Sequence, residues 1–241
     1  MLPNIALDQL LLLDIETTPA VAAFGELPEQ VQSLWLEKIT KTLPDSADGT
    51  GDYAIKAGIF AEFGKVVCIS AGFFTLENDH YQLRIKSFYD DDEKVVISGF
   101  LELVNKFYAK YPRFQFAGHN IKEFDIPYIC RRSVIHQLSL PQPLQLHGFK
   151  PWEMPMLDTM QLWRFGDYKS YTSLKLLTTI LGIPTSKDDI DGSMVASVYW
   201  NDRDLERIAT YCQKDVVAVA QLMLRFKGVP LLKEEEVVIV K

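Results

Sequence analysis

The 241-residue chain has no apolar run approaching the ~18–20 residues of a membrane-spanning helix. Its first residues lack the basic start and small-residue cleavage site of a secretory signal. The three cysteines, Cys68, Cys130 and Cys212, lack metal-site spacing, which predicts reduced, mostly buried thiols in a cytoplasmic protein. No low-complexity linker or internal repeat interrupts the chain, so we expect a single domain over residues 1–241.

An excess of positive charge is also missing. Acidic residues outnumber basic ones by 32 to 25, which gives a net charge of −7. Proteins that grip long duplex nucleic acid usually present a strongly basic face. Extensive binding to a phosphate backbone is therefore not expected, whereas an acidic site that works through bound metal on a short stretch of strand is compatible with this charge.

The most informative feature is a pair of acids after an apolar run. Residues 10–13 are all leucine and lead into Asp14, Ile15 and Glu16. This pattern predicts a buried strand with two carboxylates at its exit, on the same face because they are two residues apart. Like charges this close favour a divalent cation between them. The alternative is that Asp14 only ends the strand and residues 16–19 form a turn or a helix cap.

A third acid follows another predicted strand. Asp125 comes after a strand that ends at Gly118, and Pro127 two residues later is typical of the first turn of a helix. Taken alone, Asp125 is interpreted as the N-cap of that helix. His119, in the intervening corner, is expected to be a structural histidine rather than a ligand.

The fourth acid lies in the last long predicted helix. Tyr211 and Asp215 are four residues apart and therefore share one helical face. The alternative is a tyrosine at the edge of the core and a solvated aspartate. Cys212, between them, is interpreted as a packing residue.

The remaining patterns predict a mixed sheet covered by helices, an α/β class. Strands are expected at 65–74, 81–89 and 114–118, and helices at 90–108, 125–137, 172–181 and 202–226. Residues 24–58 are predicted to be an insertion with one helix near 29–39 followed by a loop, residues 140–155 are predicted to be a loop, and the tail 229–241 is ambiguous.

The order of these motifs resembles the DEDDy branch of the DnaQ-like 3′–5′ exonucleases. Asp14 and Glu16 on a strand, Asp125 at a helix start and the Tyr211–Asp215 pair appear in that order across residues 10–224. The resemblance implies a ribonuclease H-like fold with a mixed five-stranded sheet flanked by helices.

Two further details refine the resemblance. Asn120 and Phe124 occupy their usual places in the second motif, and Thr210 stands where the histidine branch has its histidine. Residues 152–159, 162–169, 171–174 and 189–193 look like bacterial stand-alone proteins related to the proofreading domain of family B DNA polymerases. No polymerase domain fits in 241 residues, so a free-standing nuclease is expected.

The resemblance also implies the roles of the site residues. Two Mg²⁺ or Mn²⁺ ions would be held by Asp14, Glu16, Asp125 and Asp215, with Asp14 between them, and Tyr211 would orient the attacking water. The terminal 3′ hydroxyl would be held by Ile15, Thr17 and Thr18, and the last nucleotides would be contacted by Asn120 and Phe124, the latter by stacking. Thr17 and Thr18 could equally form a turn, and Phe124 could be core.

Other residues near the motifs have simpler interpretations. Asp158 is predicted to be an N-cap, and residues 187–191 are predicted to be a solvated loop. The aromatic side chains that could line a groove or pack between helices are Trp163, Phe165, Tyr168 and Tyr171.

Single-stranded DNA is favoured as the substrate, with RNA or short oligoribonucleotides as the alternative, because the motifs do not distinguish the sugar. A non-catalytic nucleic-acid-binding module on the same fold is the alternative of another class. A generic α/β domain whose acids match by chance is the third possibility. In that last case, the four carboxylates would point to different surfaces.

Overall fold

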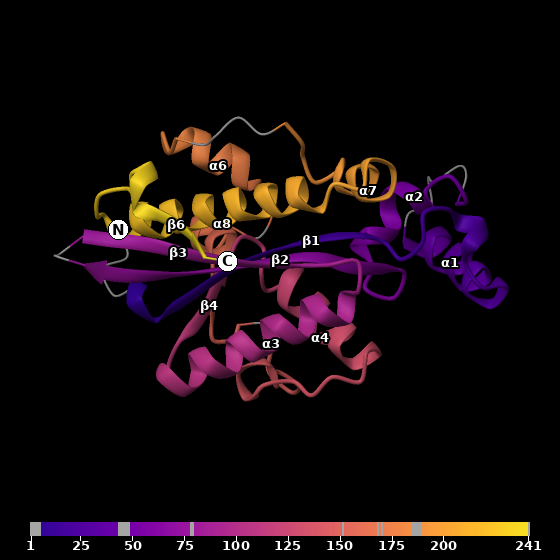
Figure 1. The fold of residues 1–241 in the computed structure, drawn as a ribbon, viewed down its shortest axis with the longest axis horizontal. Coiled ribbons are helices and arrows are strands. Elements are labelled where there is room, and N and C mark those ends of the chain that lie inside the picture. The colour runs from indigo at the N-terminus through magenta and orange to yellow at the C-terminus, as the bar shows by residue number, and fades with distance from the viewer. Residues whose placement is uncertain are drawn as a thin grey trace.

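The computed structural model describes residues 6–42, 49–77, 80–150, 152–167, 169, 171–184 and 189–240. These residues form a mixed six-stranded sheet with helices on both faces, which confirms the predicted α/β class (Figure 1). The strand order is β5-β4-β1-β2-β3-β6. The first motif therefore lies on β1, a central strand with neighbours on both sides.

The strands are β1 Leu10–Pro19, β2 Gly64–Glu77, β3 His80–Tyr89, β4 Gln115–Gly118, β5 Met156–Asp158 and β6 Val237–Val240. The strands β1, β2 and β3 are antiparallel neighbours, whereas β4, β5 and β6 join as parallel strands. The predicted number of five strands was wrong for the described residues, because the ambiguous tail pairs with β3 as β6 and completes a sheet of six.

The strand β1 is longer than the leucine run from which it was predicted. Asp14 is paired with Ser70 and Pro19 with Gly64, so the antiparallel ladder with β2 continues through both acids. The register shifts between Glu16 and Thr17, as expected for a β-bulge. The two carboxylates therefore stand within the strand, and the alternative that residues 16–19 form a turn or a helix cap was wrong.

The helices are α1 Glu29–Thr42, α2 Tyr53–Lys56, α3 Glu93–Lys110, α4 Asp125–Ile135, α5 Thr159–Arg164, α6 Leu174–Ile180, α7 Val195–Ser197 and α8 Leu205–Lys227. Each of the longer predicted helices is present, with ends that differ by a few residues. The short helix α2 replaces part of the loop expected after α1. None of the described helices is long and apolar enough to cross a membrane.

Alternation along β1 divides the core into two layers. Leu11 and Leu13 pack with α3 and α4 on one face, whereas Leu10 and Leu12 pack with α8 on the other (Figure 1). Successive side chains of a strand point to opposite faces. Asp14 and Glu16, which continue the even-numbered series, therefore face α8.

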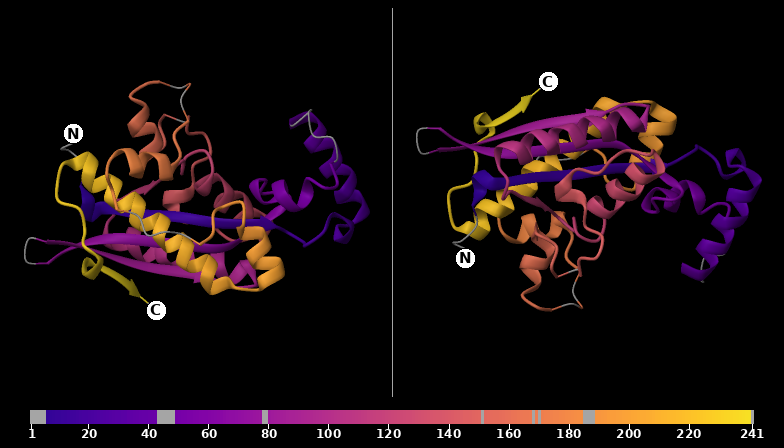
Figure 2. Two further views of the ribbon diagram at one scale, coloured as in Figure 1. Left: turned by 90° about the horizontal axis from the view of Figure 1, so that it is seen from above. Right: turned by 90° about the horizontal axis from the view of Figure 1, so that it is seen from below.

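The described residues of the 24–58 segment form a small unit at one end of the sheet, where α1 and α2 extend beyond β1 and β2 (Figures 1 and 2). Its centre is Trp35, which is fully buried and packs edge-on against Tyr53 and Phe63. The Tyr128 hydroxyl of α4 donates to the Gly58 carbonyl over 2.9 Å. The predicted insertion thus has its own aromatic core and is joined to the helix that begins at Asp125.

Candidate active site

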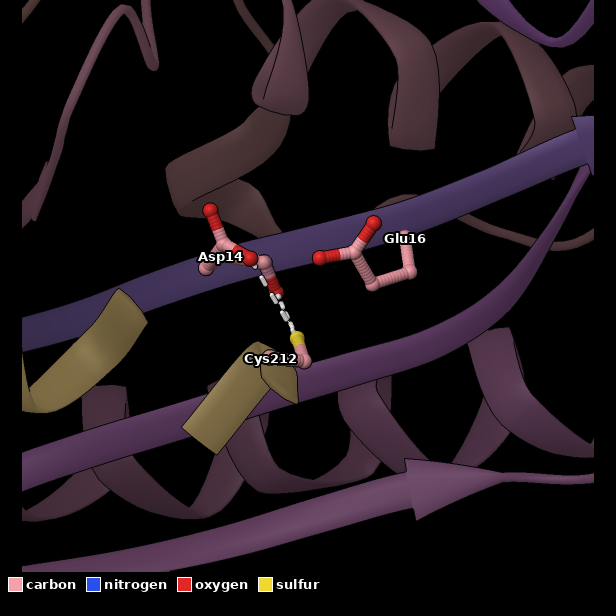
Figure 3. A group of neighbouring side chains, drawn as sticks. All are labelled: Asp14, Glu16 and Cys212. Carbon is pink, nitrogen blue, oxygen red and sulfur yellow. Dashed lines mark hydrogen bonds between the residues drawn. The ribbon is translucent and has the colours of Figure 1, made fainter. Parts of the chain in front are cut away.

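The structure brings Asp14 and Glu16 of β1 together with Cys212 of α8 (Figure 3). One potential ligand atom of each residue lies within 4.8 Å of those of the other two. Asp14 is partly exposed, whereas Glu16 is only 7% exposed. The grouping follows from strand alternation, because both acids share the β1 face that α8 covers.

Cys212 was predicted to be a packing residue, and it is fully buried. Its thiol also donates to Asp14, with Sγ 3.4 Å from the carboxylate Oδ2 and 3.3 Å from the backbone carbonyl oxygen. The sequence held a signal for this contact. Cys212 lies three residues before Asp215, and residues three apart share a helical face.

Asp125 is attached to the first motif by its carboxylate. Its Oδ1 accepts the backbone N–H of Ile15 over 3.2 Å, and the residue is only 4% exposed. The N-cap position of α4 is Phe124, and Asp125 is the first helical residue. The interpretation of Asp125 as an N-cap was therefore wrong: this carboxylate binds β1 at the residue between Asp14 and Glu16.

The corner before Asp125 is held by Asp158. Its carboxylate accepts the N–H groups of Asn120 and Lys122 at 3.1 and 3.2 Å, and those of Met160 and Gln161 at 3.0 and 3.3 Å. The predicted N-cap role is confirmed for α5, and the same side chain also fixes the turn after β4. This turn leads directly into α4 and so sets the position of Asp125.

His119 lies in the same corner as a structural histidine, as predicted. Its Nδ1 and Nε2 are hydrogen-bonded to the Thr159 hydroxyl and the Thr172 carbonyl, both over 2.9 Å. Burial lowers the pKa of His119. Because both ring nitrogens are hydrogen-bonded, the imidazole serves to hold this corner together.

Asp158→Ala is expected to lower the free energy of unfolding by roughly 2–3 kcal/mol, because the buried Met160 N–H loses its acceptor at a cost of about 1–3 kcal/mol, while water replaces the carboxylate at the three part-buried N–H groups. Urea denaturation measures the change. The matched control is Asp167→Ala, since Asp167 is exposed and, among the described residues, its carboxylate accepts the N–H of Lys169 alone. Equal effects of the two substitutions would contradict the role of Asp158 in fixing the turn after β4.

Burial and mutual repulsion set the charge state of the acids. The pKa values of Asp14 and Glu16 are raised well above their usual range, first by burial and then by the charge of Asp215. Burial raises the pKa of Asp125 to about 7. In the described part of the chain, no Lys, Arg or His forms an ion pair with Asp14, Glu16 or Asp125. The four acids thus repel one another, and in the described structure no protein cation pairs with Asp14, Glu16 or Asp125.

Tyr211 lies beside the last acid on α8. Its side chain hydrogen-bonds with Asp215, and burial followed by the charge of Asp215 raises its pKa. Tyr211 is therefore a neutral phenol at physiological pH. Both residues are partly exposed, so this edge of the site is open to solvent.

The residues expected to bind substrate fall into two groups: two have a buried polar atom without a hydrogen-bond partner among the described residues, and three are already engaged in contacts. Thr18 Oγ1 and Asn120 Oδ1 are buried with no hydrogen-bond partner in the described structure. Ile15 is buried, its N–H already bound to Asp125. The Thr17 side chain hydrogen-bonds with Tyr128, and the half-buried Phe124 ring packs against Tyr128 at 5.4 Å.

The other predicted features separate as follows. Trp163 packs against the cluster of Leu177, Ile183 and Leu222, whereas Phe165 and Tyr171 are 81% and 67% exposed. Tyr168 lies outside the described residues, as do Lys187 and Asp188. Asp189 pairs with Arg207 and Asp191 accepts from Ser193, in line with the solvated loop expected there.

The donor atoms fit a divalent cation. The Glu16 carboxylate is nearly buried and, in the described structure, forms no hydrogen bond or ion pair. A buried carboxylate without a partner is unfavourable in a protein interior. Carboxylate oxygens are the ligands that Mg²⁺ and Mn²⁺ prefer. Asp125 and Asp215 lie outside the tight group of Asp14, Glu16 and Cys212, but their charges raise the pKa of Asp14.

Comparison with known proteins identifies a related family. A family model described as "Predicted 3'-5' exonuclease related to the exonuclease domain of PolB" matches residues 59–230. The matched segment holds Asp125, Tyr211 and Asp215, and it begins after β1, which carries Asp14 and Glu16. No curated protein matches the chain.

Among solved structures, the fold is similar to that of the family B DNA polymerase from the hyperthermophilic archaeon Pyrobaculum calidifontis. The TM-score is 0.54 at 17% sequence identity, over 90% of this chain and 24% of the polymerase chain. The chain thus spans about a quarter of the polymerase's length. At this identity the likeness shows the fold, which is ribonuclease H-like.

Proposed function

Because the chain belongs to the family of predicted 3′–5′ exonucleases related to the exonuclease domain of PolB, we propose that it removes nucleotides from the 3′ ends of single-stranded DNA by metal-dependent hydrolysis. The observation that carries the proposal is the acid site. Asp14 and Glu16 lie on one face of β1, Asp125 is hydrogen-bonded to the residue between them, and the charge of Asp215 acts on all three.

The acids would hold two divalent ions, Mg²⁺ or Mn²⁺, which would lower the pKa of an attacking water and stabilise the leaving 3′ oxygen. From the family resemblance, Asp14 would contact both ions, and it is the carboxyl on which the charges of Asp215, Glu16 and Asp125 all act. Burial of Glu16 and Asp125 limits competition by bulk water for these carboxylates. The N–H of Ile15 fixes the orientation of the Asp125 carboxylate over 3.2 Å.

We assign the protein to the tyrosine branch of these nucleases because of Tyr211. Its neutral hydroxyl is hydrogen-bonded to Asp215 and lies at the open edge of the site. A neutral phenol donates or accepts a hydrogen bond, so its role is to orient the attacking water rather than to take its proton.

The 3′ terminus would be held beside the acids. Thr18 Oγ1 and Asn120 Oδ1 are buried polar atoms without partners in the described structure, as expected of atoms that bind a substrate group. The N–H of Ile15 is already bound to Asp125 and its side chain packs in the core against α3 and α4, so Ile15 is proposed to position Asp125 rather than to touch the 3′ hydroxyl. Phe124 is half-buried and could stack its open side on a terminal base.

In this proposal the described sheet and its helices form one exonuclease domain of a cytoplasmic enzyme, with residues 24–58 as an insertion and residues 229–241 as a tail. Its three cysteines are free in the structure, and free thiols are typical of proteins in that compartment.

Digestion of a 5′-labelled single-stranded DNA oligonucleotide tests the proposal. With Mn²⁺ or Mg²⁺, we expect a ladder that shortens from the 3′ end, and with EDTA or in Asp14→Ala we expect none. Digestion of RNA of the same sequence separates the oligoribonuclease alternative. Binding of either strand without cleavage under any of these conditions would favour the non-catalytic module.

Metal affinity is expected to rise with pH through about 7. The raised pKa of Asp125, about 7, means that a proton occupies part of the site near neutrality and must leave before a cation binds. Calorimetric titration of the protein with Mn²⁺ between pH 6 and pH 8 measures this rise. A flat profile would show that protons do not compete at Asp125. Asp125→Asn is the matched variant, and its binding should depend less on pH.

A further inference from the structure

The thiol of Cys212 occupies the same small volume as the carboxylates of Asp14 and Glu16. Sγ lies 3.4 Å from Asp14 Oδ2, and ligand atoms of all three residues lie within 4.8 Å of one another (Figure 3). Asp14 and Glu16 come from β1 and Cys212 from α8, so the three converge from two packed elements rather than from one loop.

A second observation points to a bound cation at this place. Glu16 is 7% exposed, and its carboxylate has no hydrogen bond or ion pair within the described structure. In Figure 3 this carboxylate points toward Asp14, on the side where the Cys212 sulfur lies. A buried, unpartnered acceptor directed at two further ligand atoms has the arrangement of an incomplete coordination shell.

The spacing of sulfur and oxygen fits a single ion. In tetrahedral zinc sites, Zn–S is about 2.3 Å and Zn–O about 2.0–2.2 Å, which sets neighbouring S and O ligand atoms roughly 3.5 Å apart. The observed separation between Cys212 Sγ and Asp14 Oδ2 is 3.4 Å. A carboxylate oxygen of Glu16 already lies within 4.8 Å of the Cys212 sulfur and of an Asp14 carboxylate oxygen. A small movement of the Glu16 side chain would therefore bring it onto the same ion.

The donor set differs from that of an all-carboxylate site. Thiolate sulfur is a soft ligand that Mg²⁺ and Mn²⁺ bind poorly and that Zn²⁺ and similar ions prefer. We propose that Cys212 gives this site a second binding mode, in which a thiophilic divalent cation such as Zn²⁺ is held by Asp14, Glu16 and Cys212. The S–H bond is replaced by a sulfur–metal bond, and the proton passes to water.

The consequence is inhibition. This second mode rests on the proposed function, because Asp14 is the carboxylate proposed to contact both catalytic ions. A thiophilic ion that takes Asp14 and Glu16 together with Cys212 removes two of the four carboxylates from hydrolysis. Zn²⁺ is therefore expected to act as an inhibitor that competes with Mg²⁺.

Spectroscopic titration with Cd²⁺ tests this binding mode without requiring nuclease activity. Wild type is expected to develop the ultraviolet charge-transfer absorption of a thiolate–Cd²⁺ bond at one ion per chain. Cys212→Ser should lose that absorption and bind Cd²⁺ at least ~10-fold more weakly, the lower end of the effect of losing a group that supports a metal. Circular dichroism and a thermal melt establish that the variant is folded.

Cys130→Ser is the matched control, because Cys130 lies on α4, where its thiol donates to the Leu144 carbonyl and not to the acids. It should keep the absorption. No thiolate–Cd²⁺ absorption in wild type, or absorption that persists in Cys212→Ser, would overturn the proposal. Absorption of this kind in a protein without nuclease activity would support the mixed site while refuting the proposed function. The two can therefore fail separately.

Discussion

Asp14→Asn is expected to reduce nucleotide release by at least ~100-fold, because bound metal contributes several kcal/mol to transition-state stabilisation and about 1.4 kcal/mol corresponds to tenfold in rate. The same substitution should make the metal-free protein more stable. Burial and then the charges of Asp215, Glu16 and Asp125 disfavour the ionised form of the Asp14 carboxyl. An amide of the same shape removes that repulsion.

The gain in stability should be about 0.5–2 kcal/mol, the usual range when a site strained for function is relaxed. For a chain of this size, about 2–4 °C in Tm corresponds to each kcal/mol. Calorimetry of the metal-free protein measures the shift. Asp8→Asn is the matched control, since Asp8 is exposed, and it should change neither activity nor Tm. A fall in Tm for Asp14→Asn would contradict the electrostatic account.

The dependence on pH has a definite sign. The raised pKa of Asp14 means that this carboxyl binds its proton more tightly in the folded than in the unfolded chain. Stability of the metal-free protein should therefore decline as pH rises from the ordinary range of an aspartate, about 4, through the raised folded value. Asp14→Asn should flatten this decline, and divalent metal should reverse it.

Arg132→Met is expected to have the largest effect on stability. Glu93 of α3 is 5% exposed, and its carboxylate accepts from Val66 N–H, Arg132 and His136 at once. Arg132 also donates to the Ala61 carbonyl over 2.9 Å. Removing the guanidinium leaves Glu93 as a buried charge with reduced compensation, which typically costs about 3–5 kcal/mol.

Chemical denaturation measures this loss, with Arg131→Met as control because Arg131 is an exposed neighbour on the same helix. A loss below about 1 kcal/mol for Arg132→Met would show that water replaces the guanidinium. The double variant Glu93→Leu with Arg132→Leu should recover part of the loss, because replacing both members of a buried ion pair is often nearly neutral. The network joins α3, β2 and α4, and so supports the helix that carries Asp125.

Local pattern was sufficient for most of the elements. The leucine run and the alternation of residues 81–89 predicted strands, and the sequence of residues 202–226 predicted the helix that the structure places at Leu205–Lys227. What the local sequence pattern could not predict was the neighbouring strand with which each strand pairs. Val237–Val240 is a strand because β3 offers an unpaired edge, and β1 continues past Asp14 because β2 pairs with it as far as Gly64.

The site shows the same division. The spacing of Asp14 and Glu16 predicted a shared face, and alternation places them toward α8. The role of Asp125 was misassigned when its own helix was considered alone, since its hydrogen-bond partner Ile15 lies 110 residues away in the sequence. Cys212 was assigned to packing for the same reason. Its contact with Asp14 exists only because α8 lies across β1.

The central claim is that Asp14, Glu16, Asp125 and Asp215 hold the ions that support hydrolysis. A crystal of the protein soaked in Mn²⁺ and measured for anomalous scattering tests this most directly. We predict manganese peaks bounded by these four carboxylates, with Asp14 contacting each ion. Manganese bound only at sites away from all four acids, in a preparation that degrades DNA from its 3′ end, would contradict the claim.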